Sequence, residues 1–276
     1  MESIAPAQAA NVRDLAGMDH LQLVLAAVAA GNTPGELWVD NAGSPHSALL
    51  WDRGHCVYLL GDAGNAPFVE AAAQWIAGEL LPQGAARGLG IFKLYRSDDA
   101  WLAQLDRLLP GRALRRLERS LFVLRPDAPL PPAPVPPAGL SLRTIDAALL
   151  ADERRSHRAD LAGEIASCSP AVERFLAHGF GFCALDDTAI AGWCTAETVS
   201  ATRCGAGIET VEAYQQRGIG AALAAAWARQ SQARGLTAWW DSWSANTPSV
   251  RVAEKSGFVP AYGYDVQLGR FEGVRG

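Results

Sequence analysis

The sequence predicts a mixed α/β fold of the α+β kind, divided into two domains. Short apolar runs of strand length are interspersed with longer segments of helical periodicity along the 276 residues. A proline-rich run at 126–138 separates two such sets, and 49% hydrophobic against 19% charged residues is the composition of a folded chain. We therefore expect a smaller N-terminal α/β domain over 1–125, a proline-rich linker over 126–138 and a second domain over 139–276.

The first half contains three strand regions and three helices by this reasoning. Glu36–Val39 and Ile91–Tyr95 are predicted to be strands, and His46–Leu60 is long enough for two strands with a turn at Asp52-Arg53-Gly54. Helices are predicted over Leu21–Ala30, Pro67–Leu81 and Asp98–Leu109. No catalytic motif lies in this half. Shaping the acceptor site and a structural or dimerisation role are both compatible with it.

The hydrophobic pattern of the segment Arg112–Leu124 does not indicate one type of secondary structure. Its arginines are interleaved with leucines, so we interpret it as the solvated face of a partly buried element rather than as a nucleic-acid patch. The basic residues concerned are Arg112, Arg115, Arg116 and Arg119. The prolines that follow at 126–138 exclude helix interior and central strand, and favour an extended, semi-rigid connector.

The second half predicts a strand, two helices and an antiparallel run of strands. The strands are expected over Leu140–Ile145, Phe180–Leu185, Ala189–Glu197 and Gly205–Glu212, and the helices over Ala147–Arg158 and Pro170–His178. The run leads directly into a glycine-containing turn. Strand, turn, helix, strand and helix then follow in the order that a right-handed crossover requires.

Within this order of elements, the turn Val211–Ala221 is the part that indicates a function. Its glycines, Gly218 and Gly220, open into an alanine-rich helix, so backbone N–H groups and the positive helix end converge where a phosphate could bind. A third glycine for a dinucleotide fingerprint is missing at Leu223, and no P-loop motif occurs. What remains is Gln215-x-x-Gly218-x-Gly220. Alone, it is compatible with a simple tight turn.

The helix after this turn has one mostly apolar stripe from Gly218 to Arg234 and should pack on a sheet. Gly235 stands where a left-handed C-cap is expected. Thr237–Trp243 predicts the next strand, and Pro248 and Gly257 suit the first turn and the end of a short helix. Asn246 is either the N-cap of that helix or a ligand contact.

Together the two segments resemble the GNAT superfamily of N-acetyltransferases. The Gln215 loop is similar to its coenzyme A loop, and Asn246-x-x-Ser249 with the closing Glu254-Lys255-x-Gly257-Phe258 is similar to its next helix. The match covers residues 139–276, where a GNAT fold with a central, mostly antiparallel sheet flanked by helices is implied. The two-domain layout is also similar to the branch of zwittermicin-resistance acetyltransferases.

The resemblance implies direct transfer of an acetyl group from acetyl-CoA to a primary amine of a small molecule, such as an antibiotic or metabolite. No metal is implied. The positions implied to bind acetyl-CoA are Thr210, Val211, Gln215, Gln216, Arg217, Gly218, Ile219, Gly220, Ala221, Asn246 and Ser249.

Two carboxylates are candidates for the proton transfer that an amine attack requires. Glu209 is the first candidate for the general base, with a merely solvated side chain as the alternative. Asp241 lies between Trp239 and Trp243 on one strand face, where it would bind a cationic amine. The alternative is that the tryptophans are core residues and Asp241 pairs with an arginine.

The chain departs from the superfamily pattern at Ala253, where many members have a tyrosine thought to protonate the leaving thiolate. Tyr262 and Tyr264 are either substitutes for that acid or packing residues. A non-catalytic acyl-CoA-binding or protein-interaction module is therefore the alternative function. A hydrolase is not supported, because there is no Gly-x-Ser-x-Gly elbow.

Charge, cysteines and hydropathy bound the partners and the location. The net charge of −5 gives no sign of a surface that binds nucleic acid. The five cysteines and five histidines lack the spacing of metal ligands, so no metal site is predicted. We expect reduced thiols, no membrane span and a cytoplasmic protein acting on small molecules. The oligomeric state is left open.

Overall fold

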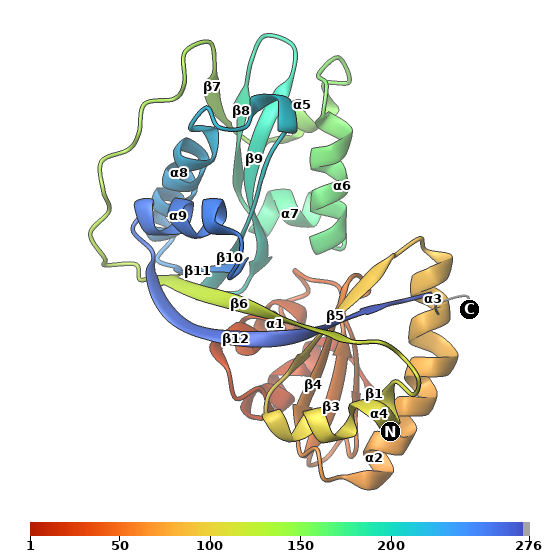
Figure 1. The fold of residues 1–276 in the computed structure, drawn as a ribbon. Coiled ribbons are helices and arrows are strands. Elements are labelled where there is room, and N and C mark those ends of the chain that lie inside the picture. The colour runs from red at the N-terminus through yellow and green to blue at the C-terminus, as the bar shows by residue number, and fades with distance from the viewer. Residues whose placement is uncertain (273–276) are drawn as a thin grey trace. The chain divides into compact units, whose positions relative to one another are not determined.

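The computed structural model describes residues 1–272 and confirms the mixed α/β fold (Figure 1). The chain forms two compact units. The first comprises Met1–Glu118 together with the chain from Asp265 on, and the second is Arg119–Tyr264. The chain passes from one unit to the other within strand β6 (Arg115–Leu124) and within strand β12 (Val259–Arg270).

These units differ from the expected boundaries at 125 and 139. The segment of uncertain type, Arg112–Leu124, contributes the strand β6, and the proline-rich run at 126–138 lies inside the second unit. Helix α8 (Ile219–Ala233) holds this run, because Gln232 Nε2 donates to the carbonyls of Arg125 at 2.9 Å and Ala128 at 2.8 Å. Proline has no backbone N–H, so a proline-rich run forms few backbone hydrogen bonds and side-chain donors help to hold it.

The first unit is a sheet with helices on both faces. Its strand order is β1 (Glu2–Ile4), β2 (Glu36–Val39), β3 (Ser47–Trp51), β4 (Cys56–Gly61), β5 (Ile91–Arg96) and β12. All of these neighbours are antiparallel except the parallel pair β4 and β5. The expected strands and the turn at Asp52 to Gly54 are confirmed, whereas β1 and β12 were not predicted.

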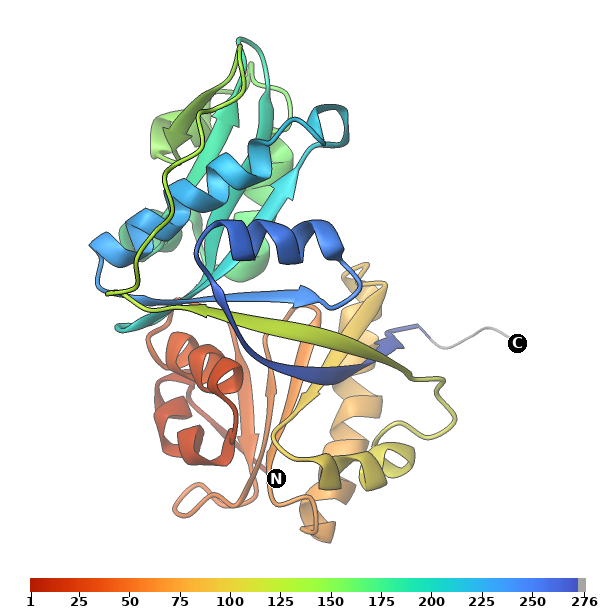
Figure 2. The same ribbon diagram turned by 60° about the vertical axis from the view of Figure 1, so that its left-hand side comes forward.

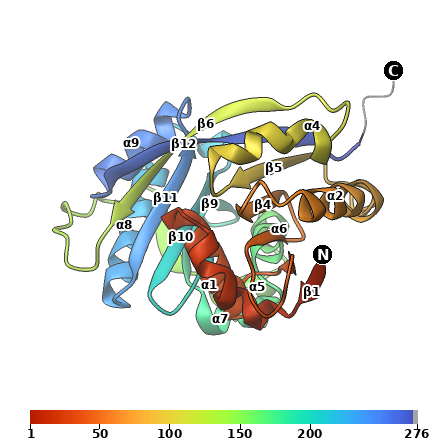
Figure 3. The same ribbon diagram turned by 90° about the horizontal axis from the view of Figure 1, so that it is seen from below.

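The three predicted helices of the first unit are present with local changes of type, whereas the helical segments at 6–15 and 82–86 were not predicted. The helical segments are η1 (Pro6–Leu15), α1 (Asp19–Ala29), α2 (Ala66–Trp75), η2 (Ile76–Leu80), α3 (Leu81–Ala86), η3 (Asp99–Gln104) and α4 (Leu105–Leu108). Figures 2 and 3 show α1 and α2 on opposite faces of the sheet. One core cluster joins Trp51 and Phe92 of the strands to Phe68 of α2, so aromatic side chains connect the sheet to this helix.

The second unit has the strand order β6, β11 (Thr237–Trp243), β10 (Arg203–Thr210), β9 (Ile190–Val199), β8 (Gly181–Leu185) and β7 (Ser141–Thr144). Its helical segments are α5 (Ala147–Ala151), α6 (Arg158–Cys168), α7 (Val172–His178), η4 (Glu212–Tyr214), α8 and α9 (Thr247–Lys255). Helices α8 and α9 cover one face and α6 and α7 the other (Figures 1 and 2).

The expected helix over Ala147–Arg158 is wrong in extent. Helix α5 ends at Ala151, and α6, which was not predicted, begins at Arg158. The break has a tertiary cause, because Ser156 pairs with the start of β9: its N–H donates to Thr188 and its carbonyl accepts from Ile190. Helical periodicity cannot report such a pairing, so the interruption was invisible in the sequence.

Candidate functional site

The parallel strands β10 and β11 separate at the end that carries the glycine turn. They pair from Arg203 with Thr237 to Gly205 with Trp239. Within residues 1–272 the ladder between them stops there, while β10 continues on β9 and β11 continues on β6. Backbone groups on the facing edges of Ala206–Thr210 and Trp240–Trp243 are therefore left without a partner strand. This opening lies directly before the start of α8.

The turn itself presents a row of unbonded amides. Gln216 has φ 59° and Gly218 has φ 83°, so the chain winds left-handedly before α8 starts at Ile219. In the described chain, none of the backbone N–H groups from Gln216 to Ala221 donates a hydrogen bond, and the first donor of the helix is Ala222, to the Gly218 carbonyl. Six unbonded donors and the positive end of a 15-residue helix form a candidate anion site.

The two glycines of the turn serve different purposes. Gly218 adopts a left-handed conformation that other residues adopt with strain. Gly220 lies inside α8, and a Cβ there would meet Thr210 Oγ1 and Val252 Cγ2 at 3.8 Å, which is ordinary contact. The fold therefore has room for a side chain at 220, whereas a ligand approaching the backbone would lose that space.

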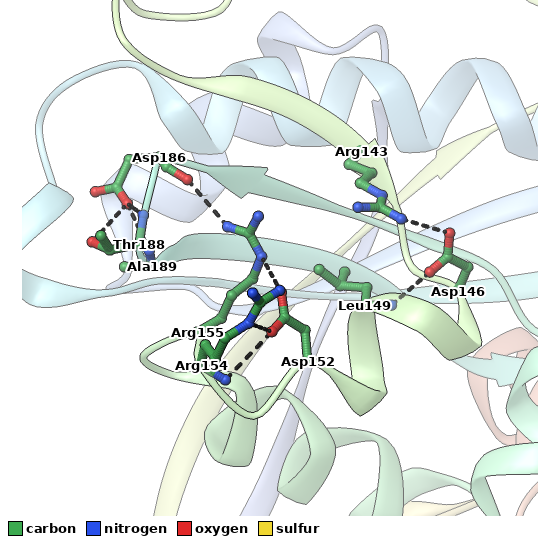
Figure 4. Close-up of polar contacts among 9 residues, drawn as sticks. All are labelled: Arg143, Asp146, Leu149, Asp152, Arg154, Arg155, Asp186, Thr188 and Ala189. Atoms are coloured by element: carbon green, nitrogen blue, oxygen red, sulfur yellow. Dashed lines mark hydrogen bonds and ion pairs between the residues drawn. The ribbon is translucent and has the colours of Figure 1, made fainter.

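A carboxylate in the turn between β8 and β9 holds the residue that precedes this loop. Asp186 accepts hydrogen bonds from the backbone N–H groups of Thr188 and Ala189, and Arg155 donates to its carbonyl at 3.2 Å (Figure 4). The hydroxyl of Tyr214 also donates to the Asp186 carboxylate, and chiefly for this reason the pKa of Asp186 falls to about 2. Tyr214 is thus fixed at the entrance of the turn.

We expect Tyr214→Phe to raise the pKa of Asp186 toward its ordinary value and to weaken acetyl-CoA binding severalfold, because the loop loses a support. The folded-state pKa of Asp186 lies below its unfolded value of about 3.9, so its stabilisation is present above about pH 4 and is lost as the pH falls toward 2. Titration of the carboxyl carbon by NMR checks this. An unchanged Asp186 titration in the variant would refute the contact.

The opposite wall of the opening begins at helix α9. The Asn246 side chain accepts from the Ser249 N–H at 3.3 Å, so it forms the N-cap. The Ser249 hydroxyl accepts from Trp240 Nε1 at 3.1 Å. Both residues predicted from the second motif are therefore engaged with the protein, and their contact with a ligand stays a prediction.

Glu209 is exposed on the face of β10 opposite α8. Its neighbours in sequence, Ile208 and Thr210, face α8, since Ile208 belongs to the core beneath it and Thr210 Oγ1 approaches Gly220. Partial desolvation and then the nearby carboxylate of Glu164 raise the pKa of Glu209. Glu164 lies on α6, an element that the sequence did not predict, so this influence was missed.

Asp241 lies on the same face of the sheet but is already partnered. Arg119 Nε donates to Asp241 Oδ1 at 2.8 Å, and the hydroxyl of Tyr264 donates to Oδ2. The Arg119 side chain is only 9% exposed, and its guanidinium lies 4.4 Å from the ring centre of Trp243. Of the two interpretations of Asp241, the arginine pair is the one present, and the cation–π contact is made by Arg119.

We expect Asp241→Asn to destabilise the second unit by about 2–4 kcal/mol, because it removes the carboxylate charge that lies beside the buried Arg119 guanidinium. Denaturant unfolding of the variant measures this change. Asp146→Asn is a comparison, since Asp146 and its partner Arg143 are 48% and 46% exposed and such surface pairs contribute little. Equal stability of Asp241→Asn and the native chain would contradict a structural role of the pair.

Ala253 is buried completely in the core shared by α8, α9 and the sheet. A side chain at this position packs inside the unit. The Tyr264 hydroxyl donates a hydrogen bond to Asp241, and the ring centres of Tyr262 and Tyr264 lie 6.3 Å apart. These contacts are compatible with the packing interpretation, and that neither tyrosine acts as the acid stays a prediction.

A second helix start in the molecule shows what a blocked site looks like. In the first unit β4 also leads through a glycine-containing turn into a helix, α2, and on to a parallel strand, β5. There Asp62 Oδ1 accepts from the Gly64 N–H and the Asn65 side chain accepts from the Phe68 N–H. Pro67 removes a further donor. This helix start uses its own side chains where the α8 start leaves its amides unbonded.

One group of side chains with metal-ligand chemistry lies near Glu209. The ligand atoms of Glu164, Cys168 and Glu197 are within 4.8 Å of one another. Cys183, Cys194 and Cys204 are buried, and burial raises the pKa of Cys183 and of Cys204 to about 12. Those buried thiols are unsuited to act as nucleophiles.

No helix within residues 1–272 has the length and apolar character to cross a membrane.

Comparison with known proteins identifies the fold. A model of the family described as GNAT acetyltransferase matches residues 14–267. A GCN5-related N-acetyltransferase-like protein from Streptococcus suis 89/1591 superposes with a TM-score of 0.69 at 20% identity, covering 97% of this chain and 100% of the other. A GCN5-related N-acetyltransferase from Sphaerobacter thermophilus gives 0.57 at 16%, covering 99% and 96%.

A tandem GNAT protein from the clavulanic acid biosynthesis pathway is similar over 98% of both chains, with a TM-score of 0.55 at 14% identity. The search of curated proteins returns no match. The resemblance to the zwittermicin-resistance branch stays a prediction. Because the family model spans both compact units and the open helix start lies within it, the chain belongs to the GNAT acetyltransferase family.

Proposed function

We propose that this protein is an N-acetyltransferase that moves the acetyl group of acetyl-CoA to a primary amine of a small molecule. The family supports acyl transfer from acetyl-CoA. The observation that carries the proposal is the row of unbonded N–H groups from Gln216 to Ala221 beside the separation of β10 and β11. The pyrophosphate would bind to these amides, and the thioester would lie along the open edge of β10.

The remaining predicted cofactor positions fit this placement in part. Thr210 ends β10 on its open edge and Val211 follows it, and the exposed Arg217 lies 5.4 Å from the ring centre of Tyr214. Gln215 uses its side-chain amide to donate to the Thr210 carbonyl at 3.1 Å, which holds the turn. We propose that Gln215 supports the loop and that Arg217 supplies charge to the phosphates.

In the proposed reaction the neutral amine attacks the thioester carbonyl carbon, a C–N bond forms and the C–S bond breaks. Glu209 accepts the proton released by the amine, and the coenzyme A thiolate leaves. N–H groups on the open edge of β10 would stabilise the oxyanion. Asp241, held by Arg119 and Tyr264, serves as structure and takes no proton.

The buried Ala253 is compatible with turnover. A thiolate of solution pKa about 8.5 is a tolerable leaving group at neutral pH, so the missing acid costs less than a missing base. The rate should rise with pH to a plateau, without a falling limb from tyrosine ionisation. We further propose a cytoplasmic enzyme without a metal, acting on small molecules rather than on nucleic acid or membranes.

The carboxylate of Glu164 should influence the pH at which the rate begins to rise. Glu164 raises the pKa of Glu209, so Glu164→Gln should lower that pKa and move the rising limb of kcat/KM to lower pH. The direction follows because the base must be deprotonated, and a lower pKa keeps it so in more acid solution. Glu173→Gln, an exposed change on α7, is the control. A limb that stays in place would mean that another group titrates.

A screen of amine-bearing metabolites and antibiotics for coenzyme A release tests the function. Acceptor-dependent release of the thiol supports an acetyltransferase. Tight acetyl-CoA binding without release for any amine would favour the alternative of a non-catalytic acyl-CoA-binding or interaction module.

A further inference from the structure

The first unit contains a pocket with a volume of about 460 Å³ that is remote in the sequence from the glycine turn. It lies where the chain after α4 meets the ends of β5 and β12. Its apolar lining includes Ile91, Pro110 and Leu268, and its basic lining consists of Arg112, Arg115 and Arg270. A volume of this size is in the range that holds small organic ligands.

One wall of the pocket is a rigid turn. Pro110 and Gly111 occupy the middle of the turn Leu109–Arg112, Gly111 has φ 68°, and the Arg112 N–H donates to the Leu109 carbonyl at 3.2 Å. Proline followed by a left-handed glycine is the pattern of a type II turn, whose conformation is fixed by these residues. The turn places Arg112 at the pocket without a flexible loop.

The positive charges of the guanidinium groups at the pocket are balanced by few acidic side chains of the described protein. Arg112 Nη1 donates to the carbonyls of Arg270 at 2.7 Å and Phe271 at 3.4 Å, which orients it and leaves other donors unused. Arg115 and Arg270 are exposed, and neither forms an ion pair with a described residue. Among the described lining residues Glu272 is the one acid, so three positive charges face one negative charge.

Apolar surface lies next to this charge. Ile91 is 38% exposed, which is unusual for a large aliphatic side chain in this molecule, and Leu268 lines the same pocket from β12. The whole chain carries a net charge of −5, so the local excess of arginine is not a general property of the surface. Guanidinium groups bind carboxylate and phosphate oxygens in pairs, and apolar walls bind hydrocarbon.

We propose that this pocket binds a small organic oxyanion, a carboxylate or phosphate carried on an apolar body. The anionic group contacts Arg115 and Arg270, and the apolar body covers Ile91 and Leu268. The site is separate from the proposed acetyl-CoA site in its residues, and its occupancy does not depend on acetyl transfer.

Calorimetric titration with phenyl phosphate and with benzoate tests the pocket, and benzylamine serves as the probe of opposite charge. Saturable binding of at least one oxyanion is expected, and none of benzylamine. Arg115→Gln and Arg270→Gln should each weaken binding about tenfold, because each removes a charged hydrogen bond from an exposed side chain that the fold does not use. The comparison of the two oxyanions shows whether phosphate or carboxylate is preferred.

Arg107→Gln is the matched control, since Arg107 is an exposed arginine of the same unit that does not line the pocket. It should bind as the native protein does. Methyl resonances of Ile91 and Leu268 should shift on titration, which locates the ligand. The proposal is overturned if neither oxyanion binds, if Arg107→Gln weakens binding as much as Arg270→Gln, or if the two methyl groups do not respond. Acetyl-CoA binding by Arg270→Gln should be unchanged, which separates this test from that of the proposed function.

Discussion

Replacing Glu209 by Gln should lower kcat by about 100-fold or more while leaving the affinity for acetyl-CoA unchanged. Glutamine has the shape of glutamate but cannot accept the proton that the attacking amine must lose. Glu209 lies on the face of β10 opposite Thr210, whose hydroxyl faces the α8 start, so the change does not touch the proposed phosphate site. Steady-state kinetics with a reactive amine, together with calorimetry on acetyl-CoA, separate the two effects.

The control for Glu209→Gln is Glu173→Gln, which removes one exposed carboxylate from the same unit. It should retain the native rate. If Glu209→Gln also retains it, the carboxylate takes no part in the chemistry and water accepts the proton.

Gly220→Val should abolish measurable acetyl-CoA binding in a protein that still folds. The backbone at 220 must approach the pyrophosphate, and a branched side chain would occupy that space. Within the protein, a Cβ at this position meets its neighbours at 3.8 Å or more, so the fold itself has room. Calorimetric titration gives the affinity, and the melting temperature establishes that the variant is folded.

A matched control for Gly220→Val is Gly78→Val, another helical glycine. An added Cβ at Gly78 meets nothing within 4 Å, and the residue lies in the first unit, away from the α8 start. Both variants place valine at a helical glycine, so a difference in acetyl-CoA affinity isolates the loop. Native affinity in a folded Gly220→Val protein would mean that the loop is only a turn.

The elements around the glycine turn were predictable because their signals are local. The apolar stripe and the terminal Gly235 specify α8, whose predicted start and end each differ by one residue from the observed helix. The strand Thr237–Trp243 agrees at both ends, and Asn246 with Pro248 specifies the start of α9. Caps, turns and periodicity depend on neighbours in sequence, which a single chain displays.

Features set by distant contacts were not predictable. Arg119 and Asp241 are 122 positions apart, and only the pairing of β6 with β11 brings them together. The effect of Glu164 on Glu209 depends on α6, which begins where Ser156 leaves its pairing with β9. The division of β6 and β12 between the two units likewise depends on sheet pairing, which no periodicity in the sequence reports.

The most direct test of the proposed function is the fate of the acetyl group itself. The protein is incubated with acetyl-CoA labelled with heavy carbon in the acetyl group and with an amine that promotes coenzyme A release, and the products are analysed by mass spectrometry. We expect the label on the nitrogen of the amine, in an amount equal to the free coenzyme A, and none of it on the protein. Label in free acetate, or on the protein without transfer to the amine, would contradict direct acetyl transfer from the site at the start of α8.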